Sequence, residues 1–238
     1  MNSLPHILTT LYYMGPPLLV AMILHEYAHG WVANRCGDPT ARLEGRLTLN
    51  PLVHIDPIGT IMVPLMCVLQ PVGMFFGWAT PVPVDPEKLN KPRRDMALVA
   101  MAGPGMNLLL AIASALVLRL AFVIDPSIAT HWAPEPSWIP RHDFSGMPWL
   151  LVAAIATYSI WINLLLMAFN LIPIPPLDGG RVLMNLLPYK VALVLSHLEP
   201  FGMMLVVSLF IFDSHLHVIG TVTGTFVPFL AQTLAPGG

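Results

Sequence analysis

Long apolar runs divide the chain and predict membrane-spanning helices. An α-helix needs about 20 apolar residues to cross a bilayer core of about 30 Å. Runs of this kind cover Ile7–Ala33, Met96–Ile124, Trp149–Asn170 and Val191–Phe212. A further run, Leu216–Leu234, is a weaker candidate because glycine and proline interrupt it. The pattern therefore predicts several membrane helices, with extra membrane segments at 191–235.

Two short segments follow a different period and predict β-strands. Between Thr40 and Asn50, polar and charged residues alternate with apolar ones or glycine, the two-residue repeat of a half-buried strand. In the second segment, Phe76–Val84, Pro81 and Pro83 remove backbone donors from the same edge. The other edge keeps its N–H groups and could accept an added strand, although an ordinary proline-protected edge strand explains the pattern equally well. Those N–H groups belong to Trp78, Thr80, Val82 and Val84.

The run Ile58–Leu69 is short for a span and contains Pro64, so we expect it to be re-entrant. Nine of the eleven Lys and Arg residues lie at 35–46, at 88–94 and at 181–190. Basic residues favour the cytoplasmic face. These groups share one face only if residues 57–76 dip into the membrane and return, or cross it an even number of times. We therefore expect the N-terminus outside; the alternative is a single crossing by this segment.

The composition is that of an integral membrane protein. Hydrophobic residues make up 55% of the 238 residues and charged residues 10%, with a mean hydropathy of +0.70. These values lie outside the usual range of a soluble domain. The net charge of -2, without a basic tract interleaved with aromatic residues, argues against nucleic acid as a partner. The expected partner is the lipid bilayer, and residues 1–238 form a single integral-membrane domain.

The first apolar run contains His25-Glu26-Tyr27-Ala28-His29, which places ionisable groups inside a predicted membrane helix. Such groups cost about 2.5–3.5 kcal/mol at the centre of a span and are functional candidates for that reason. Histidines four residues apart lie on one helix face and suit two ligands of one zinc ion. The neighbouring carboxylate of Glu26 can take a proton from water. The alternative is that both histidines are hydrogen-bonded in ordinary helix packing.

A catalytic zinc site needs a third protein ligand beside His25 and His29. Asp178 is the favoured candidate because it follows a proline-rich helix break at membrane depth and precedes two glycines. His54 and Asp56 flank proline turns, which suggests a loop at the membrane surface. The remaining candidates, to which we assign no role, are His197 and Glu199.

Three motifs together resemble the site-two protease family of intramembrane zinc metalloproteases. They are HExxH at 25–29, Gly103-Pro104-Gly105-Met106-Asn107, and Asn170-Leu-Ile-Pro-Ile-Pro-Pro-Leu-Asp178-Gly-Gly, and with their flanks they cover residues 7–190. The resemblance implies a three-helix catalytic core and one Zn2+ per chain, held by His25, His29 and Asp178. It also implies that Glu26 acts as general base and general acid.

The resemblance further implies where a substrate binds. A transmembrane protein would dock as an extended strand on Phe76–Val84, which favours the functional explanation of that free edge. Asn170 would hold the substrate backbone or the developing oxyanion, unless it only caps its helix. The candidate substrate-binding residues are Trp78, Thr80, Val82, Asn107 and Asn170.

The sequence thus predicts an all-α polytopic protein of the cell membrane, with short membrane-associated β-strands and an active site toward the cytoplasmic half. Its expected activity is hydrolysis of peptide bonds in or near transmembrane segments, as in regulated intramembrane proteolysis. One alternative is a transition-metal transporter, which would spread its ligands along a path through the membrane. Another is an inactive homologue acting as a binding scaffold, against which the intact site residues argue. No inserted soluble domain is evident.

Overall fold

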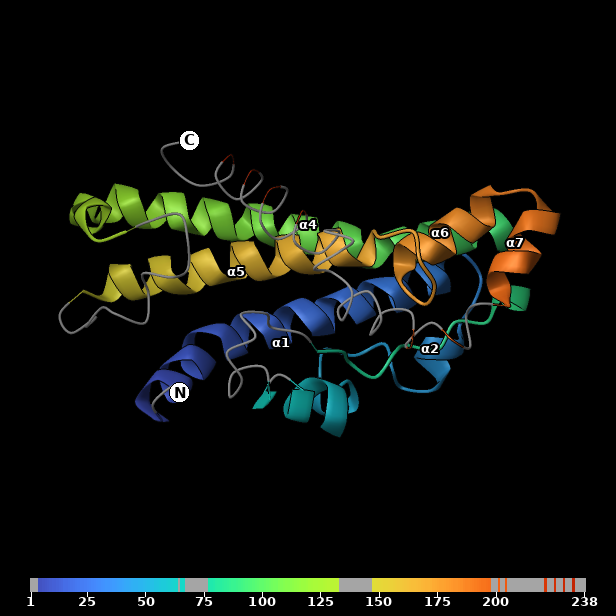
Figure 1. Cartoon of the computed structure of the whole chain (residues 1–238), viewed down its shortest axis with the longest axis horizontal. Helices are drawn as coiled ribbons and strands as arrows, with labels where there is room; N and C mark the ends of the chain where they lie inside the picture. The colour runs from blue at the N-terminus through green and yellow to red at the C-terminus, as the bar shows by residue number, and fades with distance from the viewer. Residues whose placement is uncertain are drawn as a thin grey trace.

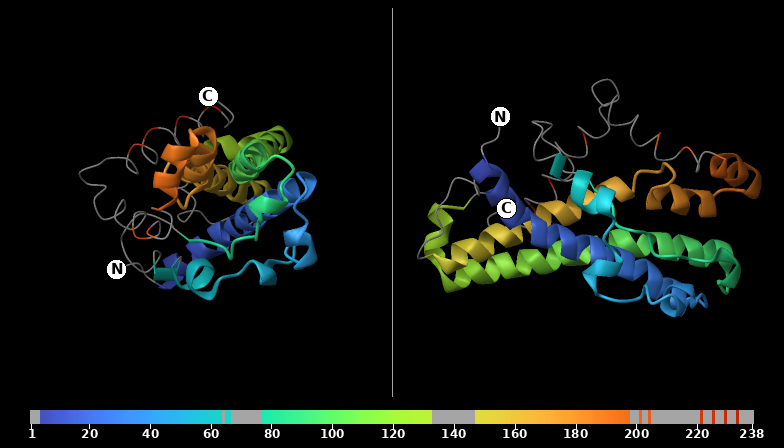
Figure 2. Two further views of the ribbon diagram at one scale, coloured as in Figure 1. Left: turned by 90° about the vertical axis from the view of Figure 1, so that its right-hand side faces the viewer. Right: turned by 90° about the horizontal axis from the view of Figure 1, so that it is seen from below.

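Three long helices form the body of the protein. The computed structural model describes residues 4–63, 65–66, 77–132 and 147–197, with single positions at 201, 204, 221, 225, 229 and 233. The long helices are α1 (Leu4–Arg35), α4 (Pro92–Ile124) and α5 (Pro148–Asn170), which confirms the helices predicted in these three regions. In Figure 1, α4 and α5 run antiparallel side by side, and Figure 2 shows α1 lying obliquely across this pair.

Short helices connect the long ones, and an Asn-Pro or Asp-Pro pair starts four of them. In each pair the side chain accepts a hydrogen bond from a backbone N–H two residues on, and the proline takes the first helical position, where no donor is needed. These four are η1 (Pro51–Val53), η2 (Pro57–Met62), η3 (Pro86–Lys88) and η4 (Pro126–Thr130). The others are α2 (Thr40–Leu43), α6 (Asp178–Leu186) and α7 (Tyr189–Ser196).

Small residues on α4 bring the helices close together. Gly103, Asn107, Ala111 and Ala115 recur every four residues and are all buried, and α4 packs there against α1 and α5. Without bulky side chains between them, helix backbones approach closely and polar groups on different helices come within hydrogen-bonding distance. The opposite side of α4 exposes large apolar residues such as Val123, 77% accessible, as expected of a face against lipid.

In the part of the chain that is described, α4 and α5 are the two helices long and apolar enough to cross a membrane, judged by length and composition. The span predicted over 191–212 is not one continuous helix, since α7 ends at Ser196 and His197 lies in a turn. Most of the remainder of that run, and most of 216–234, lie outside the described residues.

The strand predicted between Thr40 and Asn50 is wrong, because the first four residues form α2. Asp38 accepts hydrogen bonds from the Thr40 N–H and hydroxyl, at 3.0 and 2.5 Å, which closes a local turn before the helix. Gly45, with φ +69°, then reverses the chain. Local bonds from short polar side chains outweigh a two-residue hydrophobic pattern here. No residue in the described ranges belongs to a β-strand, so the predicted membrane-associated strands are not found.

Residues 77–85 are extended but belong to no sheet. Between 78 and 82 the N–H donors all lie on the edge that the prolines leave intact, which agrees with the predicted asymmetry. Three donors on this edge have partners within the chain, which an added strand would have to replace, so docking of a strand here stays a prediction. Trp78, Thr80 and Val82 donate their N–H groups, in that order, to Gly59 O at 3.1 Å, His54 O at 2.9 Å and Glu26 Oε2 at 2.9 Å.

Hydrogen bonds join the segment that follows α1 to the segment that precedes α4. Arg46 donates to Thr80 O at 2.9 Å and to Pro81 O at 3.2 Å. Asp38, which is fully buried, accepts from the Asp85 N–H at 2.7 Å. Lys88, 3.0 Å from the Asp85 carboxylate, holds the pKa of that group below its usual range. The course of 67–76 lies outside the described residues, so the re-entrant segment stays a prediction.

Candidate metal centre

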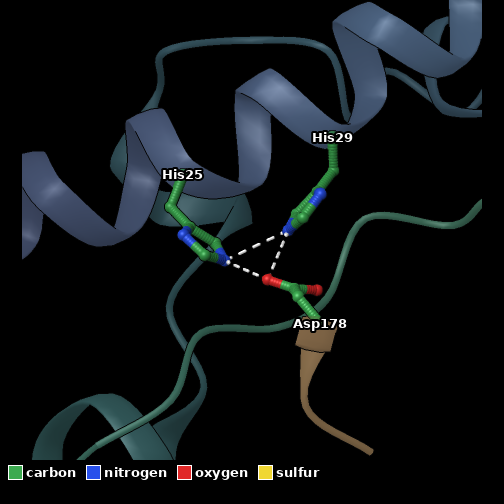
Figure 3. A group of neighbouring side chains, drawn as sticks. All are labelled: His25, His29 and Asp178. Carbon is green, nitrogen blue, oxygen red and sulfur yellow. Dashed lines mark hydrogen bonds and ion pairs between the residues drawn. The ribbon is translucent and has the colours of Figure 1, made fainter. Parts of the chain in front are cut away.

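The structure brings His25, His29 and Asp178 together in a buried cluster. The two histidines are one helical turn apart on α1, and Asp178 is the first residue of α6. Figure 3 shows the three side chains pointing at one another, and each is between 7 and 8% accessible. His25 Nε2 lies 3.1 Å from His29 Nε2 and 3.2 Å from Asp178 Oδ2, and His29 Nε2 lies 3.3 Å from Asp178 Oδ2.

Hydrogen bonds on the far side of each ring turn a nitrogen lone pair toward this point. His29 Nδ1 lies 2.7 Å from Val99 O, a backbone carbonyl that can only accept, so Nδ1 carries the proton. His25 Nδ1 lies 2.5 Å from Asn107 Oδ1. Asp178 Oδ2 is buried and has no hydrogen-bond partner outside the cluster. Electron-rich atoms that converge in this way can share a metal cation.

The spacing of the three atoms fits zinc. Ligand atoms on a tetrahedral zinc ion, at bond lengths of about 2.0–2.1 Å, lie about 3.3–3.4 Å apart. The three separations in this cluster, 3.1, 3.2 and 3.3 Å, come close to that value. Two imidazoles and a carboxylate are a common ligand set of catalytic zinc, which keeps one position open. These residues can therefore hold a zinc ion with room for water or substrate.

Glycines give the cluster its space. A Cβ on Gly103 of α4 would lie 2.4 Å from His29 Nε2 and 2.5 Å from His25 Nε2, so a side chain at this position would occupy the centre itself. A Cβ on Gly179 would lie 2.3 Å from Leu171 O. Gly179 thus lets α6 begin close against the loop that follows α5, and this approach brings Asp178 to the histidines.

Glu26 lies next to the cluster on α1, and its carboxylate has a defined orientation. Its Oε2 accepts the Val82 N–H at 2.9 Å. Val82 is buried, and its Cγ1 lies 2.9 Å from the position that a Cβ on Gly30 would take. The extended segment therefore packs closely on the helix that carries the two histidines.

The sequence model of Peptidase family M50 matches residues 16–132 and 142–210, which is most of the chain. The chain belongs to Peptidase family M50, the site-two protease family. It is 37% identical over 206 residues to the Bacillus subtilis protein named "Putative zinc metalloprotease YwhC", covering 84% of this chain and 80% of that one. It is 30% identical over 195 residues to "Putative zinc metalloprotease Rip2" of Mycolicibacterium smegmatis, covering 81% of this chain and 64% of the relative. No solved structure matches the chain.

Membership of Peptidase family M50 makes the chain a metallopeptidase and confirms the resemblance predicted from its motifs. It also agrees with zinc as the metal and with a membrane location for the two long apolar helices. The chain spans less than two thirds of the length of Rip2.

The other ligand candidates lie elsewhere in this M50 protein. His54 lies in the turn that ends η1, and its ring is buried with Nε2 2.8 Å from Thr48 O. Asp56 caps η2 by accepting from the N–H groups of Ile58 and Gly59. His197 is exposed at the end of α7, and Glu199 lies outside the described residues. Among the described residues, the single cluster with metal-ligand spacing is the one that contains Asp178.

The structure gives Asn107 two protein partners, and its role as a substrate contact stays a prediction. This residue is fully buried, and its amide contacts His25 at one end and Asn163 at the other. Asn170 is partly buried as the last residue of α5, and its Nδ2 donates to Leu166 O at 2.9 Å within its own helix. Sequence reasoning missed Asn163. It identified Gly103 as part of a small-residue stripe and of a family motif, and that spacing signals close helix packing without showing which groups pack there.

Proposed function

We propose that this M50 protein is a zinc-dependent intramembrane endopeptidase that hydrolyses peptide bonds in or near transmembrane segments. The observation that carries the proposal is the triangle of His25 Nε2, His29 Nε2 and Asp178 Oδ2, with sides of 3.1, 3.2 and 3.3 Å, next to a glutamate. Family membership supplies the reaction class. Two helices of membrane-spanning length support a site within the bilayer.

Three residues hold the metal and one moves the proton. His25, His29 and Asp178 are the ligands, one zinc ion per chain, and their burial keeps bulk water away. When bound, zinc supplies a Lewis acid that polarises the scissile carbonyl and acidifies a water molecule. Glu26 accepts the proton from that water and later delivers it to the leaving nitrogen. In the substrate-free structure, the Val82 N–H holds Glu26 Oε2 in place.

A substrate docks as an extended strand along residues 78–82 in our proposal. The alternation of donors along this segment supports it, because Trp78, Thr80 and Val82 all present N–H groups on one edge. An incoming strand would have to replace the partners that these groups now have. Replacement at Val82 also releases the Glu26 carboxylate, so docking would coincide with freeing the general base. Asn170, at the end of α5 near the loop that leads to Asp178, remains a candidate contact for the substrate backbone.

We place the active site toward the cytoplasmic half of the cell membrane, with a multi-pass chain and the N-terminus outside. Support comes from bonds between segments on either side of residues 57–76: Arg46 donates to Thr80 O, and Asn90 N–H donates to Cys36 O at 2.8 Å. Segments in direct contact lie at the same membrane face. Single cysteines at the exposed positions Glu44 and Glu87, in a cysteine-free background, should label from the same side. Labelling from opposite sides would overturn the re-entrant arrangement.

The decisive experiment compares Glu26→Gln with His25→Ala in cells and in proteoliposomes. Glu26→Gln should retain one zinc ion per chain but leave uncut the single-span membrane proteins that the unaltered enzyme cleaves, because the amide cannot accept the proton. His25→Ala should lose both zinc and cleavage. Membrane proteomes of the three strains identify candidate substrates as proteins that persist at full length in both variants. Cleavage by Glu26→Gln at the normal rate would refute the assigned role.

A metal transporter with the same ligands predicts a different result. Transport requires ligands along a path through the membrane, whereas the described residues contain one compact cluster. Zinc uptake into proteoliposomes that depends on His25 but not on Glu26, without cleavage of any membrane protein, would favour the transporter over the protease.

A further inference from the structure

A chain of buried polar groups leads from the metal centre through three helices. His25 on α1 contacts Asn107 on α4, and Asn107 Nδ2 donates to Asn163 Oδ1 on α5 at 3.0 Å. Asn163 Nδ2 in turn donates to Ser159 O at 2.8 Å. Asn107 and Asn163 are 0 and 1% accessible, which is unusual for amides in an apolar helix bundle. Buried polar groups of this kind are costly unless each is satisfied.

The donor and the acceptor of each hydrogen bond in this network follow from its end at Ser159. Ser159 O is a backbone carbonyl and can only accept, so the NH2 group of Asn163 must face it. Asn163 Oδ1 therefore faces Asn107 and accepts from the NH2 group of Asn107. That leaves Asn107 Oδ1 toward His25, where it can only accept. His25 Nδ1 must then carry a proton, and its Nε2 lone pair points into the cluster.

We propose that Asn107 and Asn163 are positioning residues that fix the tautomer of His25, so that its Nε2 is presented as a metal ligand. The proposal rests on the proposed zinc site. The two metal-ligating rings are oriented by different means: His29 Nδ1 donates to a backbone carbonyl, Val99 O, which no substitution of the Val99 side chain removes. His25 depends on a side-chain amide, and an amide can turn over. Asn163 prevents this rotation.

We call the hydrogen bonds from Asn163 through Asn107 to His25 the relay. The bonds between helices show why it needs both asparagines. If Asn107 rotated by 180° about its last bond, its NH2 group would face His25 Nδ1 and favour the tautomer with the proton on Nε2. That proton would point at Asp178 and His29, where the metal belongs. Rotation also places Asn107 Oδ1 against Asn163 Oδ1, two acceptors at about 3 Å, which is unfavourable. A second bond between the same helices, Ser114 Oγ to Ser159 Oγ at 2.7 Å, holds them in register.

Zinc affinity, measured by chelator competition on the detergent-solubilised full chain, tests the relay without reference to cleavage. Asn107→Leu removes the acceptor and should weaken zinc binding about 10–100-fold, the usual effect of losing a partner of a metal-ligating histidine. Asn107→Asp has nearly the same shape. The Asn163 amide can turn over to donate to the second carboxylate oxygen, because its Oδ1 then faces the Ser159 hydroxyl, so zinc affinity should stay within about threefold of the unaltered chain. A carboxylate accepts the His25 Nδ1 proton at either oxygen, as in carboxylate–histidine–zinc arrangements. Equal losses in the two variants would refute a role of the acceptor.

Asn163→Leu tests the second step, because its effect should depend on which residue occupies position 107. With Asn107 present, Asn163→Leu frees the amide to rotate and should weaken zinc binding about tenfold, the lower part of the range for such partners. With Asp at position 107, no orientation presents a donor, so the same substitution should cause no further loss. A merely structural role of Asn163 would lower zinc affinity in both backgrounds, and no loss in either would also refute the relay. If the unaltered chain itself bound no zinc, the proposed metal site would fail rather than the relay.

Discussion

Gly103→Ala should remove zinc from this protein by the addition of one methyl group. The added Cβ would lie 2.4 Å from His29 Nε2 and 2.5 Å from both His25 Nε2 and His25 Cε1. Non-bonded heavy atoms have their optimal contact at about 3.5–4.0 Å. The two rings, or the helices that carry them, must therefore move by about 1 Å to accommodate the methyl group.

That displacement is large on the scale of metal coordination. Ligand distances in a zinc site are held to about ±0.2 Å, so a shift of about 1 Å takes both histidines out of bonding range of one ion. We expect the zinc affinity to fall at least about 100-fold, which is about 2.8 kcal/mol at about 1.4 kcal/mol per factor of ten. The methyl group also occupies part of the space between the ligands.

Gly105→Ala is the matched control on the same helix. A Cβ on Gly105 meets no atom within 4 Å. Both substitutions improve helix propensity by the same amount, about 1 kcal/mol for glycine to alanine in a helix interior. Gly105→Ala should therefore retain one zinc ion per chain at unchanged affinity and should unfold at the same or a slightly higher temperature.

Zinc content by mass spectrometry and affinity by chelator competition distinguish the two variants, with thermal unfolding in detergent as the check on folding. Gly103→Ala should be less stable than the zinc-stripped unaltered chain by about 1–3 kcal/mol, the cost of overpacking, and should still unfold as a helical protein. If Gly103→Ala bound one zinc ion per chain with an affinity within threefold of the unaltered chain, the packing of α4 against the histidines would be wrong.

Three further substitutions probe other parts of the structure. Asp178→Asn should weaken zinc binding at least about 100-fold, because a neutral amide replaces the carboxylate that faces His25 and His29, with helical content by circular dichroism unchanged. Gly59→Ala places a Cβ 2.3 Å from the Trp78 ring, so stability should fall by about 1–3 kcal/mol while zinc stays bound; concurrent zinc loss would contradict this. Asp38→Ala removes the acceptor of the Thr40 and Asp85 N–H groups and should cost about 1–3 kcal/mol in thermal unfolding, whereas an unchanged melting temperature would show these bonds to be dispensable.

The chemistry of the candidate site follows from the sequence alone, because it depends on residue types and on short spacings. Histidines four residues apart in a helix must share a face, and an adjacent glutamate must lie near them. A helix broken by prolines before Asp178 identifies a polar group that could join them at membrane depth. The same holds for the long helices, because their apolar runs are too long for a β-strand or a short helix.

Tertiary structure decided the contacts that depend on partners far along the chain. The alternating residues at 40–50 predict a strand, but the first four form α2 beside Asp38, which bonds locally to Thr40 and also accepts the distant Asp85 N–H. The N–H groups at 78–82 lie on one edge as predicted, yet the structure gives that edge partners of its own, Glu26 among them.

The clearest division lies on α4. The sequence identifies Gly103 and Asn107 as members of one motif, and their spacing places both on one helix face. It cannot show that Gly103 leaves room for two imidazoles or that Asn107 orients one of them. Both roles exist only where α1 and α5 pack on this face of α4. The sequence by itself therefore determined the metal-binding chemistry, and the packing of three helices decided how its ligands are held.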